Sequence, residues 1–199
     1  MNETAIEFRP ATEQVAALLK GVDDQRLSDP TPCQEFTLGA LLNHLLGLTQ
    51  AFTSAARKER GPHTDTPPGL PTSDLDPQWR TTLSDRLDTL AAAWSDPEAW
   101  TGETTAGGVT LPAEIMGLVA YNEVAIHGWD LSRATGQHYA LPPEAVELLL
   151  EFDGQDADDE AARAGIYGPV FEVDPDAAPL DRLIGITGRN PAWRPDRAA

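Results

Sequence analysis

The stretch Tyr121–Leu131, YNEVAIHGWDL, decides how we expect this chain to fold. It lies within a predicted helix over about 111–135, in which Glu123 and His127 are one turn apart and project from the same face. The same face carries a stripe of apolar residues: Ile115, Met116, Val119, Ala120, Ile126, Leu131 and Ala134. A carboxylate in such a stripe is costly to bury unless a cation or a hydrogen-bond donor meets it. A metal ion would meet it, and a further ligand should then come from another helix.

A second histidine, His44, lies in the stretch LLNHLLG of another predicted helix, among small neighbours that leave space beside the imidazole. Two imidazoles and a carboxylate form a common open site for a transition metal. We therefore predict that His44, Glu123 and His127 bind a divalent metal, with Zn²⁺ as the first choice and Ni²⁺ or Fe²⁺ also acceptable. Asp130 is placed to accept the other ring N–H of His127. In the metal-free alternative, both histidines are core imidazoles and Glu123 pairs with a basic residue.

Apolar periodicity and turn residues predict four long helices with small additions. The fold class is all-α: a four-helix bundle with a long crossover loop and a short C-terminal extension. We expect a single domain over residues 1–199, with the bundle over about 1–154 and the extension over about 155–199. The long helices are predicted over about 5–22, 37–57 with Thr37 as N-cap, 76–94 with Asp76 as cap, and 111–135. Shorter helices are predicted over 142–152 and 179–187, a Pro-rich loop over 58–75 and a surface tail from 189.

Composition excludes several classes of function. The formal net charge of −18 argues against nucleic acid or an anionic membrane surface as a partner. No apolar run is long enough to span a bilayer, and the N-terminus does not read as a signal peptide. The single cysteine, Cys33, excludes an internal disulfide and is interpreted as an ordinary buried thiol. We expect a cytoplasmic protein.

Three blocks of the chain resemble one protein family. The segment TPCQEFTLGALLNHLLG, at 31–47, resembles the first signature of the mycothiol-dependent maleylpyruvate isomerase-like branch of the DinB/YfiT superfamily. The segment YNEVAIHGWDLSRATG, at 121–136, is similar to its second signature, and the segment at 168–193 is similar to the closing part of a subgroup known as metal-binding proteins. Phe36 stands where the family usually has Trp.

The resemblance implies a DinB-like four-helix bundle that binds a divalent metal through a His, a Glu and a His, which correspond to His44, Glu123 and His127. It also implies a low-molecular-weight thiol such as mycothiol as cosubstrate and an electrophilic small molecule as substrate. The characterised isomerase has a separate C-terminal domain that this chain is too short to contain, so we expect the family fold and site rather than maleylpyruvate as the substrate. Bundles of this kind can dimerise, and the sequence leaves a homodimer open.

Two functions follow from these observations. The first is a thiol-dependent S-transferase or isomerase, in which a metal-bound thiol becomes a thiolate and attacks an electrophilic carbon. The alternative is a non-catalytic metal- or ligand-binding regulatory bundle. An open coordination position beside a cavity would favour the enzyme, and a closed site with four protein ligands would favour the structural role. The sequence assigns no general acid or base.

Overall fold

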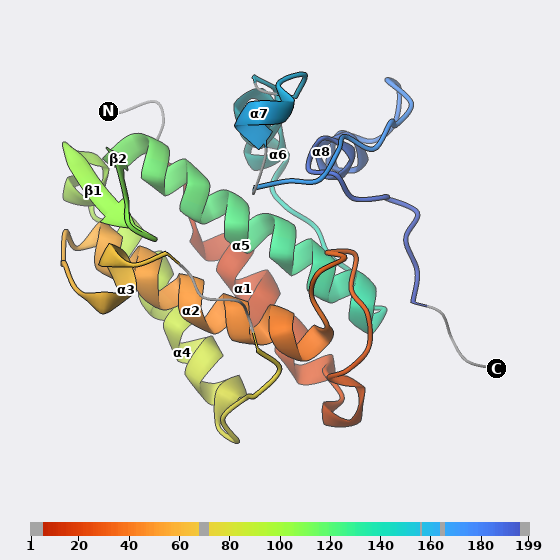
Figure 1. The fold of residues 1–199 in the computed structure, drawn as a ribbon, viewed down its shortest axis with the longest axis horizontal. Helices are drawn as coiled ribbons and strands as arrows, with labels where there is room; N and C mark the ends of the chain where they lie inside the picture. Colours follow the sequence, from red (N-terminus) through yellow and green to blue (C-terminus); the bar gives the residue numbers. More distant parts are fainter. Residues whose placement is uncertain (1–5, 68–71, 156, 164–165, 196–199) are drawn as a thin grey trace.

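The computed structural model describes residues 6–67, 72–155, 157–163 and 166–195, and it confirms the all-α four-helix bundle. The bundle helices are α1 (Arg9–Leu18), α2 (Leu38–Ala56), α4 (Trp79–Trp94) and α5 (Ala113–Thr135). Helices α1 and α2 each pack against both α4 and α5, so the order around the bundle is α1, α4, α2, α5 (Figure 1). This order makes α2 and α5 direct neighbours, and these are the two helices that carry the predicted metal ligands.

The helix ends follow local chemistry. The Thr37 hydroxyl accepts a hydrogen bond from the backbone N–H of Ala40 at 3.3 Å and so caps α2, as predicted. Helix α5 ends at Gly136, whose φ of 71° lies in the left-handed region that glycine tolerates. Helix α4 begins at Trp79, later than predicted, because the Asp76 side chain accepts from the N–H of Gln78 and forms a turn in front of the helix.

The crossover between α2 and α4 contains a short helix, α3 (Pro62–Asp65), where the sequence predicted only loop. Its first turn closes because the Gly61 N–H donates to the Thr64 hydroxyl at 3.0 Å, and proline is tolerated at a first helical position. Residues 68–71 of the predicted loop lie outside the described residues. Single 3₁₀ turns are formed by Leu19–Gly21, Asp24–Arg26 and Pro97–Trp100.

An antiparallel hairpin connects α4 to α5. Strand β1 (Glu103–Ala106) pairs with β2 (Val109–Pro112), with Ala106 opposite Val109. Gly107 and Gly108 form the two-residue turn, and their φ values of 59° and 79° suit the left-handed conformations that such a turn requires. The hairpin contacts α2, α3 and α5, so it closes one end of the bundle.

The C-terminal part forms a separate layer on α5. Helix α6 (Pro143–Gly154) pairs with α8 (Pro179–Ile186), and α7 (Glu160–Arg163) lies beside them (Figure 1). The predicted surface tail is wrong at Arg189, whose side chain is buried because it reaches a buried carboxylate on α5. Residues 196–199 of that tail lie outside the described residues. Among the described helices, none combines the length and the apolar character that a membrane span requires.

Candidate metal centre

The three predicted ligands meet between α2 and α5. The Nε2 atom of His44 lies 3.3 Å from Oε2 of Glu123, and the Nε2 atom of His127 lies 3.3 Å from the same oxygen. One ligand atom from each residue lies within 4.8 Å of the others. Helix α2 therefore supplies one imidazole, and one turn of α5 supplies the carboxylate and the second imidazole.

This donor set fits a divalent metal. Ligands bound at about 2.0–2.1 Å in a tetrahedral zinc site are about 3.3–3.4 Å apart, and each imidazole nitrogen is that far from the Glu123 oxygen. Among the described residues, Glu123 forms ion pairs with His44 and His127, and its side chain keeps 31% of its surface exposed. In the absence of a metal, both imidazoles donate to the carboxylate, which compensates for the partial burial of Glu123.

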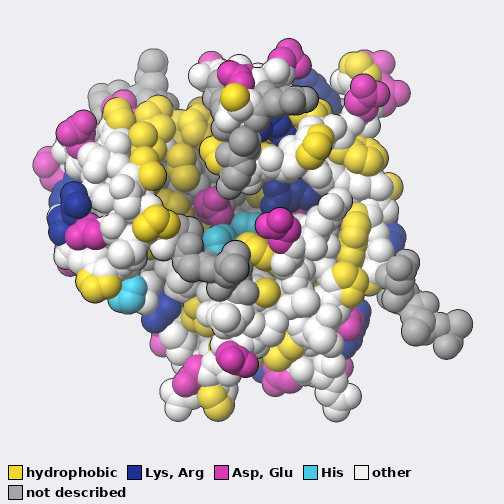
Figure 2. Space-filling model, viewed as in Figure 1, with side chains coloured by type: hydrophobic (Ala, Val, Ile, Leu, Met, Phe, Trp, Pro, Cys, Tyr) yellow, Lys and Arg dark blue, Asp and Glu magenta, His cyan; other side chains and the backbone are white. Residues whose placement is uncertain are grey.

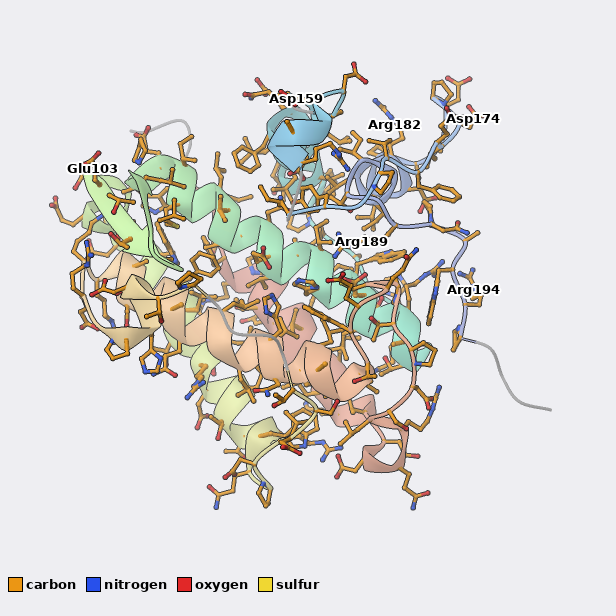
Figure 3. All side chains as sticks on the ribbon, viewed as in Figure 1. Glu103, Asp159, Asp174, Arg182, Arg189 and Arg194 are labelled. Atoms are coloured by element: carbon orange, nitrogen blue, oxygen red, sulfur yellow. The ribbon has the colours of Figure 1, made fainter. Side chains whose placement is uncertain are left out.

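A chain of polar contacts continues behind His127. Its Nδ1 lies 3.0 Å from Oδ2 of Asp130, whose side chain is fully buried. Arg189 donates to both oxygens of Asp130, from Nη2 to Oδ2 at 3.1 Å and from Nε to Oδ1 at 3.4 Å. Figure 3 shows Arg189 beside α5, where the segment after α8 returns to the bundle. Because Asp130 holds Nδ1 of His127, Nε2 is the ring nitrogen directed toward Glu123.

The charges of this chain of contacts shift the pKa values of its members. Burial opposes ionisation of Glu123, but hydrogen bonds from His127 and His44 outweigh it and hold the pKa of Glu123 well below its usual range. Burial likewise disfavours the imidazolium of His127, but the hydrogen bonds to Asp130 and Glu123 raise its pKa to about 9. The metal-free centre therefore holds an ionised Glu123 and a protonated His127 at neutral pH.

The segment before α2 closes the centre from one side. Thr31 donates its hydroxyl to the carbonyls of Cys33 and Phe36, at 2.9 and 2.8 Å, and folds this segment into a tight turn. The Phe36 ring then packs on both imidazoles, with centroids 5.2 Å from His44 and 5.8 Å from His127. An aromatic side chain at this position thus fixes the rings of both candidate ligands.

Cys33 is also part of the site, which its sequence neighbours did not reveal. It forms a second group of candidate ligands with His127 and Asp130, but the Asp130 oxygens already accept from His127 and Arg189. Burial, aided by the charge of Asp130, raises the pKa of the Cys33 thiol to about 11, so it is protonated at neutral pH. The donors on the Nε2 side of His127 are therefore the better metal site.

Two cavities open onto the centre. A polar cavity of about 490 Å³ is lined by all three candidate ligands and by Arg163, Tyr167 and Arg189 of the C-terminal layer. A second cavity of about 660 Å³ is shared by α2, α3, the hairpin and α5, and also reaches His44 and Glu123. In Figure 2, histidine side chains are visible in the hollow at the middle of the face shown, with acidic and basic side chains around it.

Sequence reasoning missed the contribution of the C-terminal layer. Arg189 of this layer is the cation that pairs with Asp130, and it lies far from Asp130 in sequence. The similarity of segment 168–193 to a family block was the one signal that this layer matters. His63 and His138, predicted to be outside the metal site, are exposed and not among the candidate ligand groups of the described residues.

Comparisons with known proteins show the family of the chain. Residues 8–132 match the family model of the mycothiol maleylpyruvate isomerase N-terminal domain. Two uncharacterised proteins of Mycobacterium tuberculosis, from strains CDC 1551 and H37Rv, are 31% identical to the chain over 173 residues, which cover 81% of this chain and 78% of each relative.

The fold resembles solved structures as well. The crystal structure of the mycothiol-dependent maleylpyruvate isomerase aligns with a TM-score of 0.58 and 23% identity, over 76% of this chain and 68% of the isomerase. A mutant of that enzyme aligns with a TM-score of 0.57. At this identity the structures establish the DinB-like fold, and the family match rests on the sequence. The chain belongs to the mycothiol maleylpyruvate isomerase N-terminal domain family.

Proposed function

We propose that this protein is a metal- and thiol-dependent S-transferase or isomerase, with mycothiol or a similar low-molecular-weight thiol as its cosubstrate. The observation that carries the proposal is the polar cavity of about 490 Å³ that opens directly onto His44, Glu123 and His127. A structural metal site is normally closed by four protein ligands, whereas a catalytic site keeps a position open beside a cavity. The cavity therefore favours an enzyme over a regulatory bundle.

His44, Glu123 and His127 would hold the metal, with Zn²⁺ as the first choice and Ni²⁺ or Fe²⁺ as alternatives. A divalent metal supplies the charge that lowers the pKa of a thiol, which is about 8.5 when free, so that the thiolate forms at neutral pH. Asp130 and Arg189 would keep the His127 ring in its orientation. Phe36 covers both imidazoles and limits the access of water from the α2 side.

The reaction class follows from the nucleophile. In an addition to an activated alkene, the thiol S–H bond breaks, the sulfur electron pair forms the S–C bond, and the carbon next to the attacked one takes up the proton. Elimination of the same thiol after rotation about the former double bond gives an isomer, and retention of the S–C bond gives a conjugate. The single cysteine in the chain and the thiol cosubstrate both agree with a reducing, cytoplasmic setting.

Calorimetric titration with mycothiol tests the proposal. The metal-loaded protein should bind mycothiol and release a proton on binding, because the thiol becomes a thiolate. The Glu123→Gln variant loses one charged ligand and should bind metal and mycothiol at least tenfold more weakly. Equal mycothiol affinity with and without metal would refute the proposed role of the thiol. Ser54→Ala, at a half-buried position of α2 that lines neither cavity, is the control and should behave like the parent.

A further inference from the structure

The second cavity differs in chemistry from the polar one. Its walls are mainly apolar side chains from α2, β2 and α5, including Leu48, Phe52, Val109, Leu111, Met116 and Val119. Among its described lining residues there is no Lys or Arg, and Glu123 supplies the one carboxyl group. We call this space the apolar cavity. In Figure 2, a broad hydrophobic area lies over the hairpin and the start of α5, to the upper left of the central hollow.

The polar cavity differs from it by the charged and polar side chains in its walls. The C-terminal layer places the guanidinium groups of Arg163 and Arg189 and the ring of Tyr167 along it, and α5 adds Asn122. The two cavities share His44 and Glu123, and they also share Val119 and the exposed Ile166. The candidate metal ligands therefore stand between a polar space and an apolar one, each of a volume that suits a small molecule.

We propose that the apolar cavity binds the electrophilic substrate and that this substrate is a neutral, apolar molecule, while the thiol occupies the polar cavity. This inference rests on the proposed function. A thiol cosubstrate that carries hydroxyl and amide groups finds guanidinium donors, from Arg163 and Arg189, only among the described residues of the polar cavity. An electrophile with carboxylates would find no Lys or Arg among the described residues that line the apolar cavity, so its carboxylates would be buried without a cationic side chain.

The positions of the two cavities also suit a reaction between their occupants. Both spaces reach His44 and Glu123, so two molecules bound on either side meet at the candidate metal ligands. Holding two reactants in contact removes most of the entropic cost of their encounter. The arrangement thus assigns each reactant its own surface and explains why α2 and the hairpin contribute no charged groups around the second space.

Gly47 offers a way to close the apolar cavity without touching the metal ligands. It lies on the exposed side of α2, lines the apolar cavity and does not line the polar one. A Cβ atom at this position would meet no described atom within 4 Å, so a larger side chain can extend into the cavity without a clash at its base. Gly47→Phe should fill the space, and Gly47→Ala is the matched control that adds one methyl group.

Two probes that differ by a single charge test the proposal by fluorescence. N-phenyl-1-naphthylamine is neutral, and 8-anilino-1-naphthalenesulfonate carries the same rings with a sulfonate. The metal-loaded protein should bind the neutral probe at least tenfold more tightly than the anionic one. Gly47→Phe should weaken binding of the neutral probe at least tenfold and leave the calorimetric affinity for mycothiol within twofold of the parent. Gly47→Ala should match the parent in both measurements.

The outcomes separate this inference from the proposed function. Tighter binding of the sulfonate, or neutral-probe binding that Gly47→Phe leaves unchanged, would overturn the apolar assignment while mycothiol binding stood. Equal losses of probe and mycothiol in Gly47→Phe would show one shared space and would also overturn it. If the neutral probe bound as expected but mycothiol did not bind at all, the proposed function would fail, and with it the role of the apolar molecule as an electrophile.

Discussion

Arg189→Met removes the cation that neutralises Asp130 while keeping a long apolar side chain in its place. The two side chains are 9% and 0% exposed, and Nη2 of Arg189 lies 3.1 Å from Oδ2 of Asp130. Removing one partner of a buried ion pair costs about 3–5 kcal/mol, because the other charge stays buried without compensation. His127 also donates to Asp130, so we expect the lower end of that range, about 3 kcal/mol.

Urea unfolding of the metal-free protein measures this cost. Because each kcal/mol shifts Tm by about 2–4 °C in chains of this size, a thermal scan should also show a decrease of roughly 6–12 °C in Tm. Arg182→Met is the matched control: Arg182 is exposed on α8, and its substitution should change the free energy of unfolding by less than about 0.5 kcal/mol. The double variant with Asp130→Asn should lose less than the sum of the two single losses, because it removes both charges.

A loss below about 1 kcal/mol for Arg189→Met, within the range of an exposed ion pair, would refute this reasoning. It would mean that the C-terminal layer does not anchor the buried carboxylate, and that Asp130 is held by His127 alone. A double-variant loss equal to the sum of the two single losses would also contradict it, because the two side chains would then not be coupled.

Four further predictions concern the centre and the helices that carry it. Asp130→Asn should weaken metal binding about 10–100-fold in a competition titration, since it replaces the charged acceptor that orients His127 with a neutral amide. An unchanged affinity would contradict that role. Because the pKa of His127 is about 9 in the metal-free protein, metal uptake at pH 7 should release one proton from it, and the apparent affinity should rise up to pH 9 and then level. By the same shift, the metal-free protein should lose stability as pH rises from about 6.5 through 9, because the folded state holds this proton more tightly than the unfolded state. Calorimetry of metal binding in two buffers measures the released proton, and urea unfolding across pH measures the change in stability. A metal affinity or a free energy of unfolding that did not change with pH would refute the corresponding prediction. Gly128→Ala should cost about 1–3 kcal/mol in urea, because its Cβ would lie 2.7 Å from both the Tyr139 hydroxyl and a Val15 methyl group, whereas Gly47→Ala should be neutral or stabilising.

Local patterns in the sequence were sufficient to predict the helices of the bundle and the candidate ligands. The spacing of Glu123 and His127 placed them on one helical face whatever the tertiary structure, and the Thr37 cap and Gly136 set two helix ends. The position of His44 opposite them depended on α2 and α5 being neighbours. The family resemblance implied that arrangement, and the structure brings the three side chains together.

The features that the sequence did not reveal all depend on long-range contacts. The approach of Arg189 to Asp130 joins residues 59 positions apart, and no periodic pattern reports such a contact. Cys33 reaches His127 only because Thr31 folds the segment before α2 over the bundle. The walls of the two cavities come from the bundle, the hairpin and the C-terminal layer. The contrast between a cavity lined by arginines and one without them therefore depends on contacts between segments far apart in sequence.

The most direct test of the central claim is the metal content of the protein, purified without chelator and without a histidine tag, and measured by elemental analysis beside His44→Ala and His127→Ala. The account predicts about one equivalent of a divalent metal, with zinc first, in the parent and almost none in either variant. Circular dichroism should show that both variants keep the helical bundle. Absence of metal from the parent even after reconstitution, or equal metal in parent and variants, would contradict a metal centre formed by His44, Glu123 and His127.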